Sequence, residues 1–196
     1  MAKNMQPVLK RCRTLGVSPA AMGYNKTSNK NPGGQRRAKK SEYATQLTEK
    51  QKVKFVYGIQ EKQFRNYYEK AARMPGNTGD NLLTLVERRL DNVVYRAGFG
   101  MSRRQARQLV LHRHFTVNGH TVNIPSFLVK PGDVIEVRGS ACEKIKENVE
   151  KNASRPVPMW MSFDKDALKV VVNRLPERSE IELDVEEQLI VELYSK

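Results

Sequence analysis

The chain has 196 residues, 39% of them hydrophobic and 29% charged, with a formal net charge of +14 and a pI near 9.9. That length allows one large or two small domains, and so strong a positive charge points to an anionic partner. The sequence contains neither a run near the roughly 20 apolar residues of a membrane-spanning helix nor an apolar signal-peptide core. We therefore expect a cytoplasmic protein that binds nucleic acid and not a membrane.

Residues 1–40 form a basic arm with ten lysines and arginines and no acidic residue. The arm is rich in turn formers and has too few apolar residues for a core. We expect it to be extended and ordered only by a partner, following the phosphates of folded RNA; a solubilising tail is the alternative. Its predicted RNA contacts are Lys10, Arg11, Arg13, Arg36, Arg37, Lys39 and Lys40.

Residues 41–75 predict two helices separated at Gly58. The first begins near Ser41, and the second runs from about residue 60 to 74, before a Pro-Gly-Asn turn. The second places Phe64, Tyr67 and Tyr68 at helical spacing. Such aromatics could stack on bases, but their spacing favours packing in a core.

Residues 80–98 predict one amphipathic helix, because apolar residues recur at intervals of three and four. Asp80 or Thr78 can cap its start, and Gly98 can end it. A further helix begins with the capping-box pattern of Ser102 and Gln105 and extends to about residue 112.

The helix after Ser102 has an apolar side and a basic side. At roughly 100° per residue, Arg103 and Arg107 share one face, joined by His114 if the helix reaches that far. Arg104 and Gln108 border the same face. This arrangement predicts a surface of arginines that can fork onto phosphate oxygens.

The hydrophobic period changes to two after this helix. Residues 115–117 and 120–122 flank Asn118-Gly119, the preferred dipeptide of a type I′ hairpin. A loop over 123–129, a tight turn over 130–133 and a strand over 134–137 follow. Asn118 at the turn can reach a phosphate or a ribose hydroxyl.

The last third of the chain predicts a helical or flexible stretch at 139–155, strands at 159–163 and 169–175, and a helix at 186–194. The whole is an α+β fold, with a mainly helical domain and a small domain of antiparallel strands and helices. Residues 175–196 are strongly acidic, so they form either a solvated face or a surface that docks a protein.

Residues 101–110 (MSRRQARQLV), 112–114 (HRH), 117–119 (VNG) and 129–135 (VKPGDVI) resemble the small RNA-binding module named after ribosomal protein S-four. In that family, the arginine-bearing helix and the Val-Asn-Gly hairpin form one RNA-facing surface. The resemblance supports the following set of RNA-binding residues: Ser102, Arg103, Arg104, Arg107, Gln108, His112, Arg113, His114, Asn118 and Lys130.

The rest of the chain is similar to the ribosomal protein family itself, through residues 41–43 (SEY), 49–52 (EKQK), 60–65 (QEKQFR), 87–96 (ERRLDNVVYR) and 189–195 (LIVELYS). The resemblance implies a structural constituent of the small ribosomal subunit, not an enzyme. It implies binding of the 5′ domain of 16S ribosomal RNA early in assembly. It also implies contact with ribosomal protein S-five, proximity to messenger RNA where it enters, and an influence on translational accuracy.

We accordingly divide the chain into the arm at 1–40, a helical domain at 41–80 joined by 176–196, and an RNA-binding domain at 81–175 with its core module at 82–138. Many relatives carry a four-cysteine zinc knuckle in the arm, whereas here Cys12 is the single cysteine before Cys142. A structural zinc site needs about four ligands, so we predict the zinc-free form and no cofactor. His112, His114 and His120 are better explained as RNA contacts or surface residues than as metal ligands.

Two alternatives remain. Pseudouridine synthases join the same module to a catalytic domain and use an aspartate in an Arg-Leu-Asp context, which occurs at 89–91. Here Asp91 lies within a predicted helix, where a solvated or salt-bridged role is expected, and the chain is too short for that catalytic domain. The other alternative is a stand-alone RNA-binding factor that acts on ribosomes. For the RNA site itself, we predict that Arg103→Glu with Arg107→Glu strongly weakens RNA binding while the fold survives.

Overall fold

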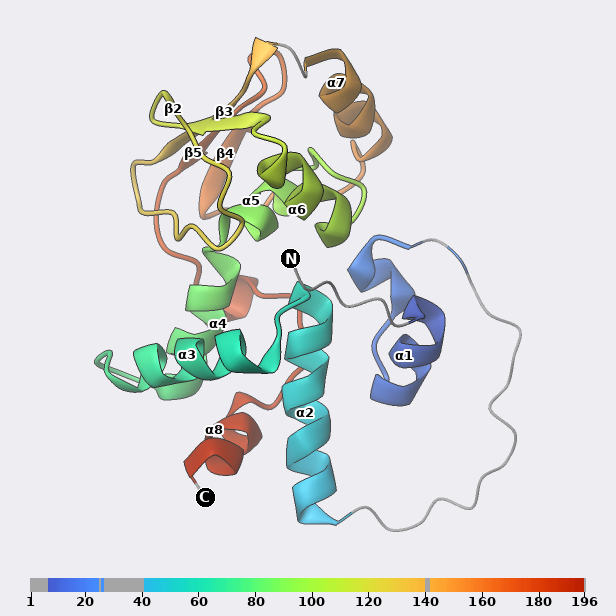
Figure 1. The fold of residues 1–196 in the computed structure, drawn as a ribbon, viewed down its shortest axis with the longest axis vertical. Coiled ribbons are helices and arrows are strands. Elements are labelled where there is room, and N and C mark those ends of the chain that lie inside the picture. Colours follow the sequence, from blue (N-terminus) through green and yellow to red (C-terminus); the bar gives the residue numbers. More distant parts are fainter. Residues whose placement is uncertain (1–6, 25, 27–40, 140–141, 196) are drawn as a thin grey trace. The chain divides into compact units, whose positions relative to one another are not determined.

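A computed structural model describes residues 7–24, 26, 41–139 and 142–195 (Figure 1). The chain divides into two compact units. The helical unit comprises Met1–Gly79 together with Leu183–Lys196, and the mixed unit comprises Asp80–Glu182. The described residues contain no helix that is long and apolar enough to cross a membrane.

The helical unit contains α1 (Val8–Leu15), a short 3-10 helix η1 (Pro19–Met22), α2 (Glu42–Tyr57), α3 (Glu61–Ala72) and α8 (Glu187–Ser195). Ser41 begins α2, because its hydroxyl accepts a hydrogen bond from the Ala44 amide at 3.2 Å. Gly58 ends α2 in the left-handed conformation, with φ of 64°. The two helices predicted over 41–75 and the break between them are thus confirmed.

The core of the helical unit joins residues far apart in the sequence. Phe64 and Tyr67 of α3 are buried, which confirms that these aromatics pack in a core. Tyr68 stacks on Tyr194 of α8 with ring centroids 4.7 Å apart. The fully buried side chain of Gln46 donates to Glu192 of α8 at 3.1 Å. The C-terminal helix therefore completes the packing of α2 and α3.

The described part of the basic arm differs from the extended segment expected from its composition. It forms α1 and η1, and it buries Cys12, Leu15 and Met22. Arg11 also donates to Gln51 of α2 at 3.2 Å. The reason is that the few apolar residues of the arm lie at helical spacing and have α2 to pack against.

The predicted single helix over 80–98 is wrong, because two helices occupy this segment. The first, α4 (Thr78–Glu87), is followed by α5 (Leu90–Arg96). Between them Arg89 is extended and pairs with Leu128 in an isolated β-bridge. The Leu90 amide donates to the Phe127 carbonyl at 2.8 Å, and the Val129 amide donates to the Arg88 carbonyl at 3.0 Å. Backbone hydrogen bonds to the 125–129 segment thus replace one turn of helix.

The mixed unit contains a five-stranded antiparallel sheet in the order β2-β1-β3-β5-β4. Its strands are β1 (Phe115–Val117), β2 (His120–Thr121), β3 (Val134–Val137), β4 (Met161–Asp164) and β5 (Lys169–Val172). Asn118 and Gly119 both have positive φ, at 50° and 79°, as a type I′ turn requires. The predicted hairpin and the α+β fold class are confirmed.

One hydrophobic core holds the mixed unit together. Residues of α5, α6 (Arg103–Leu111), α7 (Cys142–Lys151) and the strands contribute to it (Figure 1). Phe99 packs edge-on against Phe163 with centroids 5.3 Å apart, and the single tryptophan, Trp160, is 1% exposed. A 3-10 helix η3 (Arg178–Glu180) follows the sheet. This core fixes α6 next to the β1–β2 hairpin.

Candidate nucleic-acid interface

The basic helix α6 begins at a side-chain cap, as its sequence predicts. The Ser102 hydroxyl accepts from the Gln105 amide at 3.4 Å. The Gln105 side chain reaches one residue further back than expected and accepts from the Met101 amide at 2.7 Å. These bonds satisfy amides that have no partner within the helix and fix where α6 starts.

Arg103, the first residue of α6, points into the unit and not toward solvent. It is 9% exposed, and its Nε donates to Asn92 Oδ1 of α5 at 2.9 Å. Its guanidinium carbon lies 4.3 Å from the centre of the Tyr95 ring. The prediction that Arg103 lies on the outer basic face is therefore wrong. Its replacement by glutamate would bury a carboxylate in place of the guanidinium. The double variant Arg103→Glu with Arg107→Glu is therefore expected to disturb the fold as well as RNA binding.

Arg107 lies one turn further along α6 and is half-buried. Its Nη1 is 3.6 Å from Asp91 Oδ2, and 27% of its side chain is exposed. Asp91 is mainly engaged by Arg89, at 3.0 Å for Nε–Oδ1 and 2.6 Å for Nη2–Oδ2. Of the two roles expected for Asp91 in a helix, solvated or salt-bridged, the structure shows the salt-bridged one.

The remaining basic residues of this segment form an outward face. Arg104, Gln108, His112 and Arg113 are exposed, whereas Ser102 and His114 are half-buried. Residues 102–114 include no aspartate or glutamate. The surface from Arg104 to Arg113, here called the α6 basic face, therefore presents positive charge without an acidic residue of its own.

The hairpin beside α6 is braced by the side chain that was predicted to touch RNA. Asn118 Nδ2 donates to Asp133 Oδ1 at 2.9 Å, and Asn118 Oδ1 accepts from the Val134 amide at 2.8 Å. Asp133 also accepts from the Lys130 amide at 2.7 Å. The side-chain nitrogen and oxygen of Asn118 thus both hold the turn in position. The side chain of Lys130 is exposed beside it.

The predicted contacts of the arm are only partly described. Lys10 and Arg13 are exposed on α1, and Arg11 is half-buried. The other four predicted contacts lie outside the described residues; these are Arg36, Arg37, Lys39 and Lys40.

Sequence reasoning missed Arg155, which holds the segment that leads into α6. Its Nη1 donates to the carbonyls of Tyr95 at 2.9 Å and Gly100 at 3.1 Å, and its Nη2 donates to that of Met101 at 3.3 Å. Its guanidinium carbon also lies 4.2 Å from the centre of the Tyr95 ring. A lone arginine beside prolines carries no pattern that could have indicated this role.

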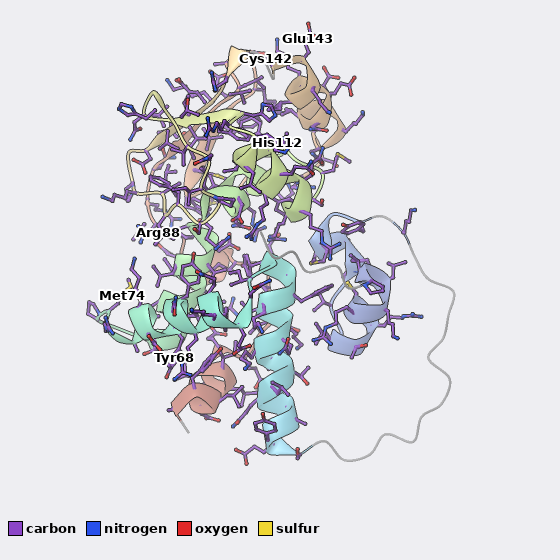
Figure 2. All side chains as sticks on the ribbon, viewed as in Figure 1. Tyr68, Met74, Arg88, His112, Cys142 and Glu143 are labelled. Carbon is purple, nitrogen blue, oxygen red and sulfur yellow. The ribbon has the colours of Figure 1, made fainter. Side chains whose placement is uncertain are left out.

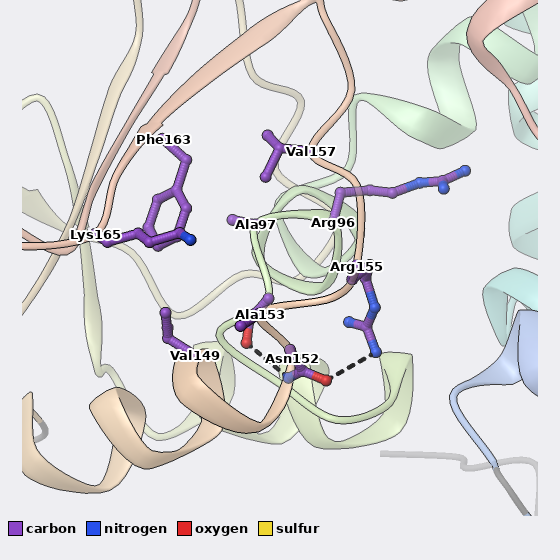
Figure 3. A pocket seen from close by; sticks show the side chains of 10 residues that line it. Arg96, Ala97, Val149, Asn152, Ala153, Arg155, Val157, Phe163 and Lys165 are labelled. Atoms are coloured by element: carbon purple, nitrogen blue, oxygen red, sulfur yellow. Dashed lines mark hydrogen bonds between the residues drawn. The ribbon is translucent and has the colours of Figure 1, made fainter.

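A cavity of about 70 Å³ adjoins this arginine (Figure 3). Its lining includes Ala97, Val149 and Phe163, and Figure 3 shows the Arg155 guanidinium turned toward Asn152, whose side chain accepts from it at 3.1 Å. A water molecule occupies about 30 Å³ in the liquid, so the cavity has room for only a few water molecules. A nucleotide has many more atoms and does not fit. The interface is therefore the outer surface and not this cavity.

The acidic C-terminal residues of the mixed unit partly neutralise arginines of the same unit. Glu182 pairs with Arg96 at 2.9 Å, and Glu180 pairs with Arg174 at 2.7 Å. Arg96 also pairs with the buried Glu87 at 3.0 Å. Within the described residues, no group of three or more histidines, cysteines or acids is placed to hold a metal ion.

Two family models match the chain in succession. The ribosomal protein S4/S9 N-terminal domain matches residues 3–87. The S4 domain matches residues 88–135, which include α5, α6 and the β1–β2 hairpin. The second match therefore covers the α6 basic face.

Curated relatives match over the whole chain. The small ribosomal subunit protein uS4 of Agathobacter rectalis is 53% identical over 198 residues, with both chains fully covered. The protein of the same name from Lachnospira eligens is 52% identical, also with full coverage of both chains. That of Pelotomaculum thermopropionicum is 59% identical over 83% of this chain and 79% of its own. The chain belongs to the uS4 family of small ribosomal subunit proteins.

Proposed function

We propose that this chain binds ribosomal RNA of the small subunit through the α6 basic face and the adjoining hairpin. The observation that carries the proposal is that Arg104, Gln108, His112 and Arg113 are exposed on α6 and directly after it, in a stretch at 102–114 that contains no aspartate or glutamate. Arg104, Arg107 and Lys130 are the side chains best placed to meet phosphates, and Asn118 acts by positioning the hairpin.

Binding follows from charge and shape. Arginine and lysine neutralise phosphates and release their condensed counterions, so affinity falls as salt rises. A guanidinium can fork onto two phosphate oxygens, which adds direction to the charge. Recognition of folded RNA depends mainly on its shape and its loops, because the deep groove of an A-form helix is closed to side chains. A rigid helix and hairpin are suited to such a target.

The family assignment narrows the function class. The chain is a structural constituent of the small ribosomal subunit and not an enzyme, because its full-length relatives bear the name of a ribosomal protein. Asp91, the aspartate that a pseudouridine synthase would use, is buried and paired with Arg89, and this also disfavours that alternative. Within that class, we propose that the chain is a primary binder of the 5′ domain of 16S ribosomal RNA that nucleates assembly in the cytoplasm.

The proposal extends to protein neighbours. We infer contact with ribosomal protein S-five, an influence on translational accuracy, and proximity to messenger RNA where it enters. The acidic residues around 177–187 are the proposed protein-docking surface; the side chains of Glu177 and Glu182 support this, being 69% and 66% exposed. We also propose a division into an arm at 1–40, a helical domain at 41–80 with 176–196, and an RNA-binding domain at 81–175. The compact units support joining the C-terminal segment to the helical domain, but they leave the arm in the helical unit and residues 176–182 in the mixed unit.

A binding titration with a single charge reversal tests the RNA site. The full chain is titrated against the 5′ domain of 16S ribosomal RNA across a salt series, with transfer RNA as competitor. Arg104→Glu is compared with Lys165→Glu, which makes the same charge change at an exposed site in the turn between β4 and β5. Loss of one phosphate contact should lower the salt slope by about one.

We expect tight, competitor-resistant binding by the wild type and by Lys165→Glu. Affinity should fall at least about tenfold for Arg104→Glu. Equal losses in both variants would mean that net charge alone drives binding, and this would contradict the assigned surface. Equal affinity of the wild type for both RNAs would instead favour a general basic RNA-binding protein.

A further inference from the structure

A cluster of basic side chains lies where the end of α6, the end of β3 and the start of α7 meet. We call its members, His112, Arg113, His114, Arg138 and Lys144, the basic corner. The Arg138 amide donates to the His114 carbonyl at 2.9 Å, and Arg138 Nη1 donates to the Arg113 carbonyl at 3.4 Å. The His112 and His114 rings are 6.0 Å apart. Three separate elements thus bring positive charge to one place.

The start of α7 closes the corner. The Cys142 thiol donates to the Arg138 carbonyl at 3.7 Å, and Lys144 follows two residues later with an exposed side chain. Figure 2 marks His112 directly after α6, and Cys142 and Glu143 on α7. Arg138 and Lys144 lie beyond the 88–135 match to the S4 domain.

The charges of the corner act against one another. Burial lowers the pKa of His114, and the charges of His112, Lys144 and Arg138 lower it further. Glu143, next to Lys144, is the acidic residue of this part of α7, and it is exposed. Like charges held together in this way oppose protonation of the imidazole, and an anion bound among them would reverse that effect.

The backbone conformation of Arg113 offers a way to test its side chain. Arg113 has φ of 62°, in the left-handed region, directly after the last turn of α6. Helices commonly end with glycine in this conformation, because a Cβ atom there is unfavourable. The side chain of Arg113 is exposed. Glycine would be less strained at this position, so exchanging Arg113 for glycine removes the side chain without straining the backbone.

We propose that the basic corner is a site for an RNA phosphate and that filling it takes up a proton on His114. This inference rests on the proposed RNA-binding function and deepens it, because it names Arg138 and Lys144 as phosphate ligands and adds a dependence on pH. A phosphate diester near His114 stabilises the charged form of its imidazole. By linkage, RNA affinity then increases as the pH falls through the range where histidine titrates.

A pH series of the RNA titration tests proton uptake. The full chain is titrated against the 5′ domain of 16S ribosomal RNA at pH 6 and pH 8, at one ionic strength. His114→Gln removes the titrating group, and His120→Gln is the matched control, since His120 is an exposed histidine of the same unit. Uptake of one proton can change the affinity by at most about tenfold per pH unit.

We expect wild type and His120→Gln to bind about three- to tenfold more tightly at pH 6 than at pH 8. His114→Gln should lose most of this gain. Wild-type affinity that is specific but independent of pH would overturn proton uptake and leave the proposed function intact. A lack of specific binding at every pH would instead defeat the proposed function itself.

Arg113→Gly separates binding from folding. Because glycine adopts the left-handed conformation freely, we expect the thermal midpoint of the variant to be unchanged or higher. We expect its RNA affinity at pH 7 to fall about tenfold and its salt slope to drop by about one. An unchanged affinity and slope in this folded variant would remove Arg113 from the site and overturn the assignment of the corner.

Discussion

Arg155 should carry much of the stability of the mixed unit, although it lies outside the matched S4 domain. Arg155→Met removes donors to three backbone carbonyls and the contact with the Tyr95 ring. A hydrogen bond from a charged group contributes about 1.5–3 kcal/mol, and a cation–π contact about 0.5–2 kcal/mol, without simple additivity. Methionine keeps part of the apolar stem and needs no guanidinium desolvation, so we expect a net loss of about 2–4 kcal/mol.

Urea unfolding monitored by Trp160 fluorescence measures this loss. Trp160 is the only tryptophan and is buried in the mixed unit, so its signal reports unfolding of that unit. If the free energy of unfolding falls by about 2 kcal/mol per molar urea, the expected midpoint shift is about 1–2 M. Lys165→Met is the control, since Lys165 lines the same cavity with an exposed side chain; we expect a change within about 0.5 kcal/mol.

Arg155→Lys refines the test. A lysine keeps the charge, but its single ammonium lacks the planar fork that reaches several carbonyls at once. We expect a midpoint between those of the wild type and Arg155→Met. A midpoint for Arg155→Met within about 0.2 M of the wild type would refute the stabilising role of Arg155, because its three hydrogen bonds to backbone carbonyls would then contribute nothing measurable.

Two further predictions concern other parts of the chain. Asn118→Ala removes the hydrogen bonds to Asp133 and Val134 and should destabilise the mixed unit by about 1–2 kcal/mol in the same fluorescence assay; no shift would show that the turn dipeptide alone sets the hairpin. In the helical unit, burial raises the pKa of Glu61, but hydrogen bonds from Lys54, Lys50 and Tyr194 outweigh it and lower the pKa to about 2. A depressed carboxylate pKa stabilises the fold above the ordinary value of 4.5, and this stability is lost as the pH falls from there to about 2. Glu61→Gln should therefore weaken the acid dependence of helical circular dichroism in this range. An unchanged acid profile would contradict a stabilising role for the hydrogen bonds that Glu61 accepts.

Much of the local structure follows from the sequence. Ser41 and Gly58 mark the ends of α2, and Asn118-Gly119 marks the hairpin, because caps and tight turns depend on the chemistry of a few adjacent residues. The sign of the charge also follows from the sequence, because residues 102–114 contain arginines and histidines but no aspartate or glutamate. These features indicated the α+β class and the helix that we propose as the RNA-binding one.

The structure alone decided which of two adjacent arginines is exposed. Arg103 and Arg104 are neighbours in one basic run, yet Asn92 and Tyr95 of α5 draw Arg103 inside while Arg104 stays exposed. In the same way, the break between α4 and α5 depends on backbone partners some 40 residues away, as in the Val129–Arg88 hydrogen bond.

The physical reason is the range over which each preference acts. Propensity, capping and net charge are properties of a short segment, so the sequence by itself determined the elements, the turn and the sign of the surface. Burial and hydrogen-bond partners depend on segments distant along the chain. Arg155 therefore gained its role only when the fold placed it beside the carbonyls that precede α6.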